Sequence, residues 1–108
     1  MKTEQILMAT TVLAAAALTK QRFVNFDGAM SGATDAQLGV ANANYDQGEQ
    51  AGVSTHGVIL VEAGGTVAKG AQVQSDATGR AITLAAGVAG GRAMDAAAAA
   101  GEFVRVLR

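Results

Sequence analysis

The chain has 108 residues and a formal net charge of −1, with no cysteine, no proline and no tryptophan. This length fits one domain, and the lack of cysteine excludes disulfides and cysteine-bound metals. No basic cluster is present, which argues against nucleic-acid binding through phosphates. Half of the residues are hydrophobic, but 25 of them are alanine. The core is therefore modest, and we expect a partner to contribute to stability.

The first 18 residues are apolar and carry charge only at Lys2 and Glu4. A secretory signal peptide is one interpretation, since a basic residue precedes an apolar run. Glu4 weakens this interpretation because it reduces the positive charge that precedes the apolar run of a signal peptide. The apolar run 6–18 is also too short to span a membrane. We expect the segment to belong to the mature protein. Its apolar residues fall on both alternating faces, so we predict an arm or edge strand that reaches a partner. Pairing inside its own domain is the alternative.

Downstream, short alternating segments separated by Gly, Asn and Asp predict β-strands. The predicted strands are 22–26, 37–41, 49–54, 56–62, 71–75, 81–84 and 102–107. The segment 56–62 is apolar on both faces, which is typical of a strand covered on both sides. Five consecutive alanines are too few for an independent helix, so we expect at most one helical turn near 95–100. The sequence therefore predicts an all-β fold, a small β-barrel or sandwich with Gly-rich turns.

Similar residues recur in the same order in two halves of the chain. The matches are Lys20, Val24 and Asp27 with Lys69, Val73 and Asp76, Gly39 and Ala41 with Gly91 and Ala93, and Gly48, Glu49 and Val53 with Gly101, Glu102 and Val106. We interpret them as a tandem pseudo-repeat of about 19–56 and 66–108. These halves would lie in a single β domain of residues 19–108, preceded by the arm of residues 1–18.

No group of residues forms a recognisable catalytic pattern. His56 is the only histidine, no Gly-x-Ser-x-Gly motif is present, and the carboxylates lack the spacing of a calcium loop. We therefore expect no enzyme, with no catalytic, metal-binding or cofactor-binding residue. His56 is expected to be a hydrogen-bonded structural residue, and neither nucleic acid nor membrane is expected as a partner.

One local segment, VEAGGTVAKGAQV at 61–73, matches the hairpin of biotinyl and lipoyl carrier domains. Those domains are also small β-sandwiches, but they modify a lysine at the tip of a separate hairpin. Here Lys69 lies within the turn itself. Glycine at positions of positive φ and valine on the flanking strands explain the match. A biotinyl- or lipoyl-like carrier or binding domain is the alternative function.

Four segments, at 17–28, 38–41, 61–82 and 91–107, occur in an order that is distinctive although each one alone is not. Through these segments the whole chain resembles the capsid cement proteins of tailed phages, also called head decoration proteins. The resemblance implies a structural protein without an active site, located in the virion on the outer surface of the capsid. There it would stabilise contacts between major capsid subunits. Its partners would be the major capsid protein and further copies of itself, with a trimer preferred to a dimer.

Apolar residues on the arm and on the last strand are the candidate contact residues. In the last strand Val104 and Val106 alternate with Phe103, Arg105 and Leu107, so the two sets lie on opposite faces. We predict that the valines face the core and that Phe103 and Leu107 contact another subunit. The complete set of predicted interface residues is Ile6, Leu7, Met8, Val12, Leu13, Phe23, Phe103 and Leu107.

Overall fold

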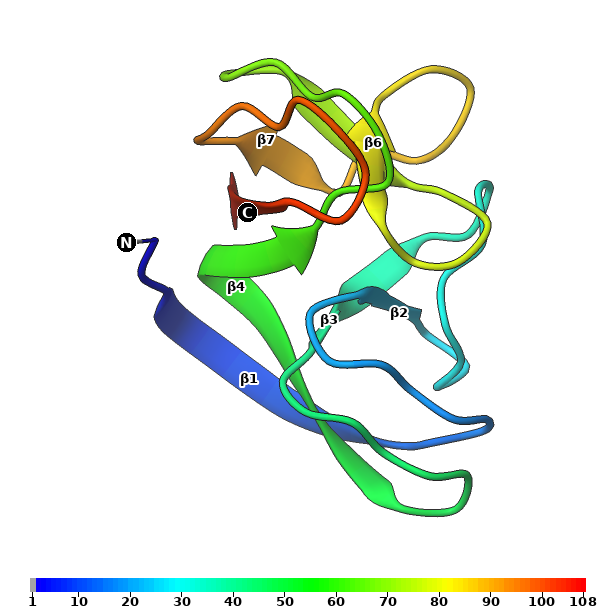
Figure 1. Cartoon of the computed structure of the whole chain (residues 1–108). Coiled ribbons are helices and arrows are strands. Elements are labelled where there is room, and N and C mark those ends of the chain that lie inside the picture. The colour runs from blue at the N-terminus through cyan, green and yellow to red at the C-terminus, as the bar shows by residue number, and fades with distance from the viewer. Residues whose placement is uncertain (1) are drawn as a thin grey trace.

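Eight antiparallel strands form one sheet that curls into a nearly closed barrel (Figure 1). The computed structural model describes residues 2–108. The strands are β1 (Gln5–Leu13), β2 (Phe23–Asn25), β3 (Gln37–Ala41), β4 (Gln50–Glu62), β5 (Gln72–Ser75), β6 (Ala81–Thr83), β7 (Gly91–Ala93) and β8 (Phe103–Leu107). Their order is β2-β3-β4-β8-β7-β5-β6, and β1 pairs with β4. The predicted all-β fold is confirmed.

The long strand β4 connects the two parts of the sheet. Its residues 50–58 pair with β1, and its residues 58–62 pair with β8. Gly57 lies between these parts with φ of +121°. A Cβ there would clash with the backbone of Gln5 and Leu7, so only glycine permits β1 to cross so closely. The predicted strands 49–54 and 56–62 are one strand, because His56 continues the pairing with β1.

The second part of β4 is covered on one face only. Ile59 and Val61 are fully buried, whereas Val58 and Leu60 on the other face are half-buried. The prediction that both faces are covered is therefore wrong for the face that carries Val58 and Leu60. Apolar residues on both faces of a strand show that both faces favour burial. One of the two faces can, however, be buried by another protein chain rather than by the same domain.

The strand register follows the two-half pattern of the sequence. The pairs of Ala9–Leu13 with β4 have counterparts between β4 and β8, and the pairs of Phe23 and Val24 with β3 have counterparts between β5 and β7. Examples are Thr10–Val53 with Ile59–Val106, Val12–Ala51 with Val61–Val104, and Val24–Gly39 with Val73–Gly91. The pseudo-repeat and its boundaries stay a prediction, which these matching pairs support.

One predicted match between the halves differs in the structure. The side-chain Oδ1 of Asn25 accepts hydrogen bonds from the backbone N–H groups two and four residues ahead, both at 3.0 Å. Asp76 Oδ1 makes the same two bonds, at 2.8 and 2.9 Å. The counterpart of Asp76 is therefore Asn25 and not Asp27. Both side chains stabilise their turns by this local hydrogen bonding.

Buried side chains form two clusters, which we name by the half that supplies most of their residues. The first-half cluster contains Ala14, Leu18, Val24, Ala41, Ala51 and Val53. Its counterparts Ala63, Val67, Val73, Ala93, Val104 and Val106 belong to the second-half cluster, which also contains Phe23, Val40 and Ile59. Ala14 and Leu18 are thus core residues, although they fall within the segment 1–18 that was predicted as the arm.

The barrel closes where β2 meets the turn between β5 and β6. There the N–H of Phe23 donates to the carbonyl oxygen of Gly79 at 2.7 Å. Beside this bond the Glu62 carboxylate contacts the guanidinium groups of Arg22 at 3.3 Å and Arg80 at 3.6 Å. These half-buried ion pairs link the first half to the second.

The alanine-rich segment 95–100 forms no helical turn in the described structure. Ala97 forms a two-residue bridge with Val67, with hydrogen bonds in both directions at 2.8 and 2.9 Å, and its side chain is buried. This agrees with the expectation of at most one helical turn near 95–100, and no turn forms because pairing across the loop replaces local helical bonds. Strand β7 is absent from the predicted strands because its three residues contain one small apolar side chain.

Equivalent buried valines give a test of the single-domain prediction. Val53 and Val106 are both 0% exposed. We expect Val53→Ala and Val106→Ala each to lower the free energy of unfolding by about 2 kcal/mol, because each leaves a cavity. Both variants should unfold in one transition, measured by circular dichroism in urea. Val88→Ala, at an exposed loop residue, is the control, with a change within about 0.5 kcal/mol. Two separate transitions would contradict a single domain.

Candidate interaction surface

One face of the sheet, formed by the second part of β4 and by β8, carries exposed apolar side chains. Val58 lies opposite Leu107, and Leu60 lies two residue pairs further along, opposite Arg105. Residues directly opposite each other on antiparallel strands point to the same face, and successive even positions of β4 do so as well. We call this the outer face and define it by Val58, Leu60, Phe103 and Leu107. Phe103 is 38% exposed and Leu107 is 53% exposed.

The predicted alternation on β8 is confirmed. Val104 and Val106 are fully buried in the second-half cluster, whereas Phe103 and Leu107 are exposed. Sequence reasoning did not include Val58 and Leu60 among the contact residues. The signal was available in the two apolar faces of 56–62, but only the register of β4 with β8 joins them to Phe103 and Leu107.

Most of the predicted contact residues on β1 are also exposed. Leu7 is the most exposed at 76%, followed by Leu13, Met8 and Ile6, whereas Val12 is half-buried and packs against the first-half cluster. One edge of β1 pairs with β4, and no described strand pairs with its other edge. This nine-residue strand has no charged side chain. Such an edge is a template for the addition of another strand.

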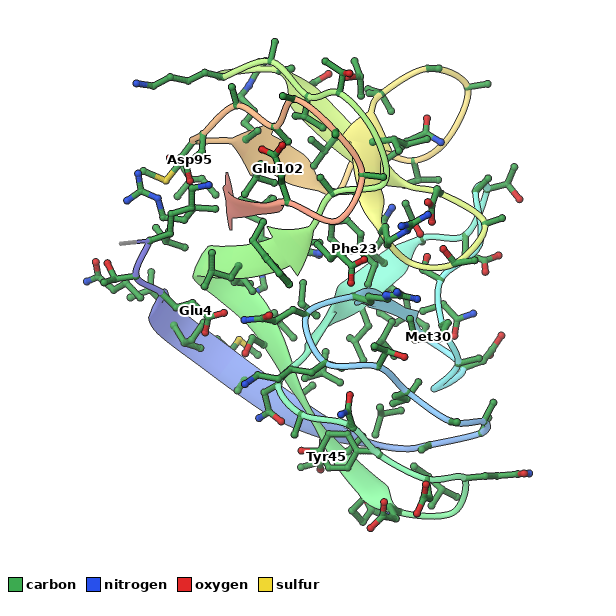
Figure 2. All side chains as sticks on the ribbon, in the orientation of Figure 1. Glu4, Phe23, Met30, Tyr45, Asp95 and Glu102 are labelled. Atoms are coloured by element: carbon green, nitrogen blue, oxygen red, sulfur yellow. The ribbon has the colours of Figure 1, made fainter. Side chains whose placement is uncertain are left out.

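Residues 2–4, which precede β1, contact the outer face. Lys2 Nζ donates to the carbonyl oxygen of Phe103 at 2.7 Å, and the Glu4 carboxylate accepts from the N–H of Leu60 at 3.0 Å. Glu4 lies at the N-terminal end of β1, next to β4 (Figure 2). The arm and the outer face therefore form one continuous surface.

Phe23 is the predicted contact residue that lies elsewhere. Its side chain is 0% exposed and belongs to the second-half cluster. The guanidinium of Arg108 lies 6.0 Å from its ring centroid, and burial lowers the pKa of that guanidinium. Phe23 is therefore a core residue of the folded chain, and we leave it out of the contact surface.

A paired charge lies between the two exposed side chains of β8. Arg105 donates to both carboxylate oxygens of Asp95 at 2.9 Å, and its backbone N–H donates to the same carboxylate at 3.0 Å. The hydrogen bonds from the Arg105 side chain lower the pKa of Asp95 to about 2. The Asp95 carboxylate thus holds the Arg105 side chain in place and neutralises its charge. An ion pair of fixed geometry therefore lies between Phe103 and Leu107.

His56 is exposed on β4 rather than in the core, with Nδ1 3.1 Å from Thr55 Oγ1. Among residues 2–108 there is no pocket and no group of three or more His, Asp and Glu side chains that could hold a metal ion. The same residues include no helix that is long and apolar enough to cross a membrane.

The Asp95–Arg105 pair predicts a pH-dependent stability difference. Asp95→Asn should lower the melting temperature near pH 7, because Arg105 loses its carboxylate partner. Since the pKa of Asp95 falls from 3.8 to about 2 on folding, the pair stabilises the fold above about pH 4 and loses this effect as the pH falls through about 2. The difference in melting temperature should therefore shrink over that interval. Asp27→Asn, at an exposed turn, is the control, and a difference that does not change with pH contradicts the prediction.

A comparison with known protein families identifies the family of this chain. The family model described as phage cement protein matches residues 1–108, the whole chain. A search of the curated proteins finds no match. The family match extends over the arm, both halves and the outer face. The chain therefore belongs to the phage cement protein family, whose role is structural and associated with the phage capsid.

Proposed function

We propose that this protein binds the outer surface of the phage head and stabilises contacts between major capsid subunits. Membership of the phage cement family supports a structural role at the capsid. The observation that carries the finer proposal is the unpaired, uncharged edge of β1 beside the apolar outer face. A small protein with little core of its own gains stability when both features are covered.

The arm binds the major capsid protein by strand addition. A capsid segment in extended conformation pairs with the free backbone groups of β1, and its side chains pack against Leu7 and Leu13, which are 76% and 57% exposed. Strand addition satisfies backbone donors and acceptors while it buries side chains on both faces. This mode needs no change in the pairing between β1 and β4.

The outer face binds further copies of the chain. Phe103 and Leu107 supply the large apolar side chains that are enriched at the centre of homo-oligomeric contacts. A trimer, which we prefer to a dimer, presents three arms to the head at once. Several weak contacts that act together bind far more tightly than one. Each contact can therefore be small and still hold neighbouring capsid subunits together under internal pressure.

The proposed role involves no catalysis, in keeping with a structural family. No observation favours the biotinyl- or lipoyl-like carrier alternative, since the cement family match covers the hairpin of Lys69 along with the remaining chain. We expect the purified protein to have its unmodified mass at Lys69 and Lys20.

Removal of the arm tests binding to the head. Deleting residues 2–8 keeps Ala9–Leu13, which pair with β4 in regular register. We expect the variant to fold, because residues 2–8 are exposed, and to bind heads about tenfold or more weakly. Co-sedimentation with expanded heads that lack the protein measures binding, and circular dichroism measures folding. Lys69→Ala is the control for an exposed residue elsewhere.

Two results would contradict the arm proposal. If the shortened protein is unfolded, residues 2–8 belong to the structural core. If it folds and binds heads like the full chain, the arm is not the contact.

A charge on the outer face tests self-association. Phe103→Asp and Leu107→Asp place a carboxylate in an apolar contact, and we expect each to reduce the molar mass measured by light scattering to that of a monomer. Thr83→Asp, at the exposed last residue of β6, should keep the mass of the wild type. A monomeric wild type, or variants with unchanged mass, would show that the outer face is not a contact between copies.

A further inference from the structure

Residues 2–4, which we call the strap, are attached to the outer face by two charged side chains. The Glu4 carboxylate accepts from the N–H of Leu60 on β4 at 3.0 Å. Lys2 Nζ donates to the carbonyl oxygen of Phe103 on β8 at 2.7 Å. Each charged group thus pairs with a backbone group of a strand that carries the outer face.

The two backbone groups face opposite edges of the pair of strands β4 and β8. Gly57 and Arg108 exchange two backbone hydrogen bonds of 3.0 Å, and hydrogen-bonded pairs alternate with other pairs along antiparallel strands. The N–H of Leu60 therefore faces away from β8, and the carbonyl oxygen of Phe103 faces away from β4. Buried side chains fill the inner face of both strands. The strap therefore crosses the outer face from one edge of the strand pair to the other.

The surroundings of the strap agree with this path. Leu60, which lies beside Glu4, is half-buried, whereas Leu107 at the other end of the outer face is 53% exposed. The hydrogen bonds of Arg105 contribute most to the lowered pKa of Asp95, and the charge of Lys2 lowers it further. Lys2 thus lies near the ion pair on the far side of the outer face.

Two irregularities in register separate the strap from the regular part of β1. Ala9–Leu13 pair with successive residues of β4, whereas the register shifts on both sides of Met8 and leaves Leu7 without a partner. Such a bulge interrupts the hydrogen bonding between two strands locally. The strap can therefore leave the outer face while Ala9–Leu13 keep their pairing with β4.

We propose that the strap is an intramolecular cover of the outer face, which a second copy of the chain displaces when it binds there. This inference rests on the proposed function and adds the regulation of the same contact. The two hydrogen bonds of the strap come from exposed side chains, and such contacts contribute little each. An apolar contact that buries Phe103 and Leu107 therefore displaces the strap at a moderate loss of affinity.

The strap has a consequence for where the copies associate. Free chains at low concentration keep the outer face covered, because displacement of the strap opposes a contact that is weak by itself. Copies that are bound side by side on a head have a high effective concentration, which overcomes this opposition. The strap thus favours association on the head over association in solution.

A double substitution that leaves the net charge unchanged tests the strap. Lys2→Ala with Glu4→Ala removes both contacts, one basic and one acidic, so the formal net charge stays at −1. The control, Lys20→Ala with Asp46→Ala, removes the same two kinds of charge from exposed residues. Asp46 follows Tyr45, which lies near the opposite end of β1 from Glu4 (Figure 2).

The association constant is obtained from the molar mass measured by light scattering over a range of concentrations, and circular dichroism measures folding. We expect the strap variant to associate about fivefold more tightly than the wild type, because the strap no longer competes for the outer face. The control variant should associate like the wild type. Addition of Leu107→Asp to the strap variant should return the mass to that of a monomer, and a gain that persists would overturn the inference.

The amide of Leu60 gives a separate measurement of the strap. Its N–H donates to Glu4, so its hydrogen exchange, followed by NMR in dilute solution, should be faster in the strap variant than in the control variant. Equal exchange rates in the two variants would show that the strap does not cover this edge and would overturn the inference.

The remaining outcomes separate this inference from the proposed function. If the wild type associates and the strap variant associates equally or less tightly, the inference is overturned and the proposed function stands. If the wild type stays monomeric, self-association through the outer face is overturned and the inference with it. Should the double variant unfold, Lys2→Ala alone decides, with tighter association in support and unchanged association against.

Discussion

The bend of β4 at Gly57 is the constraint on which the arrangement of the molecule depends. One strand ends the first half and begins the second, and Gly57 pairs there with Arg108 through two backbone hydrogen bonds of 3.0 Å. A side chain at this position would clash with the backbone of Gln5 and Leu7 and displace β1. The absence of a Cβ thus brings the arm to the edge of the outer face, where Lys2 and Glu4 bind.

The core explains why so much apolar surface remains outside it. Each half is filled by alanine, valine and a few larger residues, and such small clusters bury little area per residue. The two ion pairs of Glu62, with Arg22 and with Arg80, add a link between the halves at the closure of the barrel. The larger side chains Leu7, Leu13, Phe103 and Leu107 lie on the surface instead. In a cement protein this distribution fits a chain that reaches full stability in an assembly.

The arm and the outer face differ in the kind of contact that each one suits. The arm presents unpaired backbone groups, whereas the outer face presents large apolar side chains. Backbone pairing and apolar burial are different sources of binding energy. A head that uses both is braced without any single strong interaction.

The sequence by itself determined most of the strand-forming segments, the alternation on β8 and the two-half order of residues, but not the short strand β7. These properties depend on local periodicity and on turn residues, which are visible without any contact. The spacing between matching residues of the two halves also reappears in the strand register. Thr10 pairs with Val53, and the matching residues Ile59 and Val106 pair with each other in the same way. Only the tertiary structure decided that β1 pairs with its own β4, that Phe23 is buried, and that Ala97 bridges Val67 in place of a helical turn. Each of these features depends on contacts between residues that are distant in the sequence. The alternation of apolar residues identifies the two faces of a strand, but it does not specify which residues cover each face.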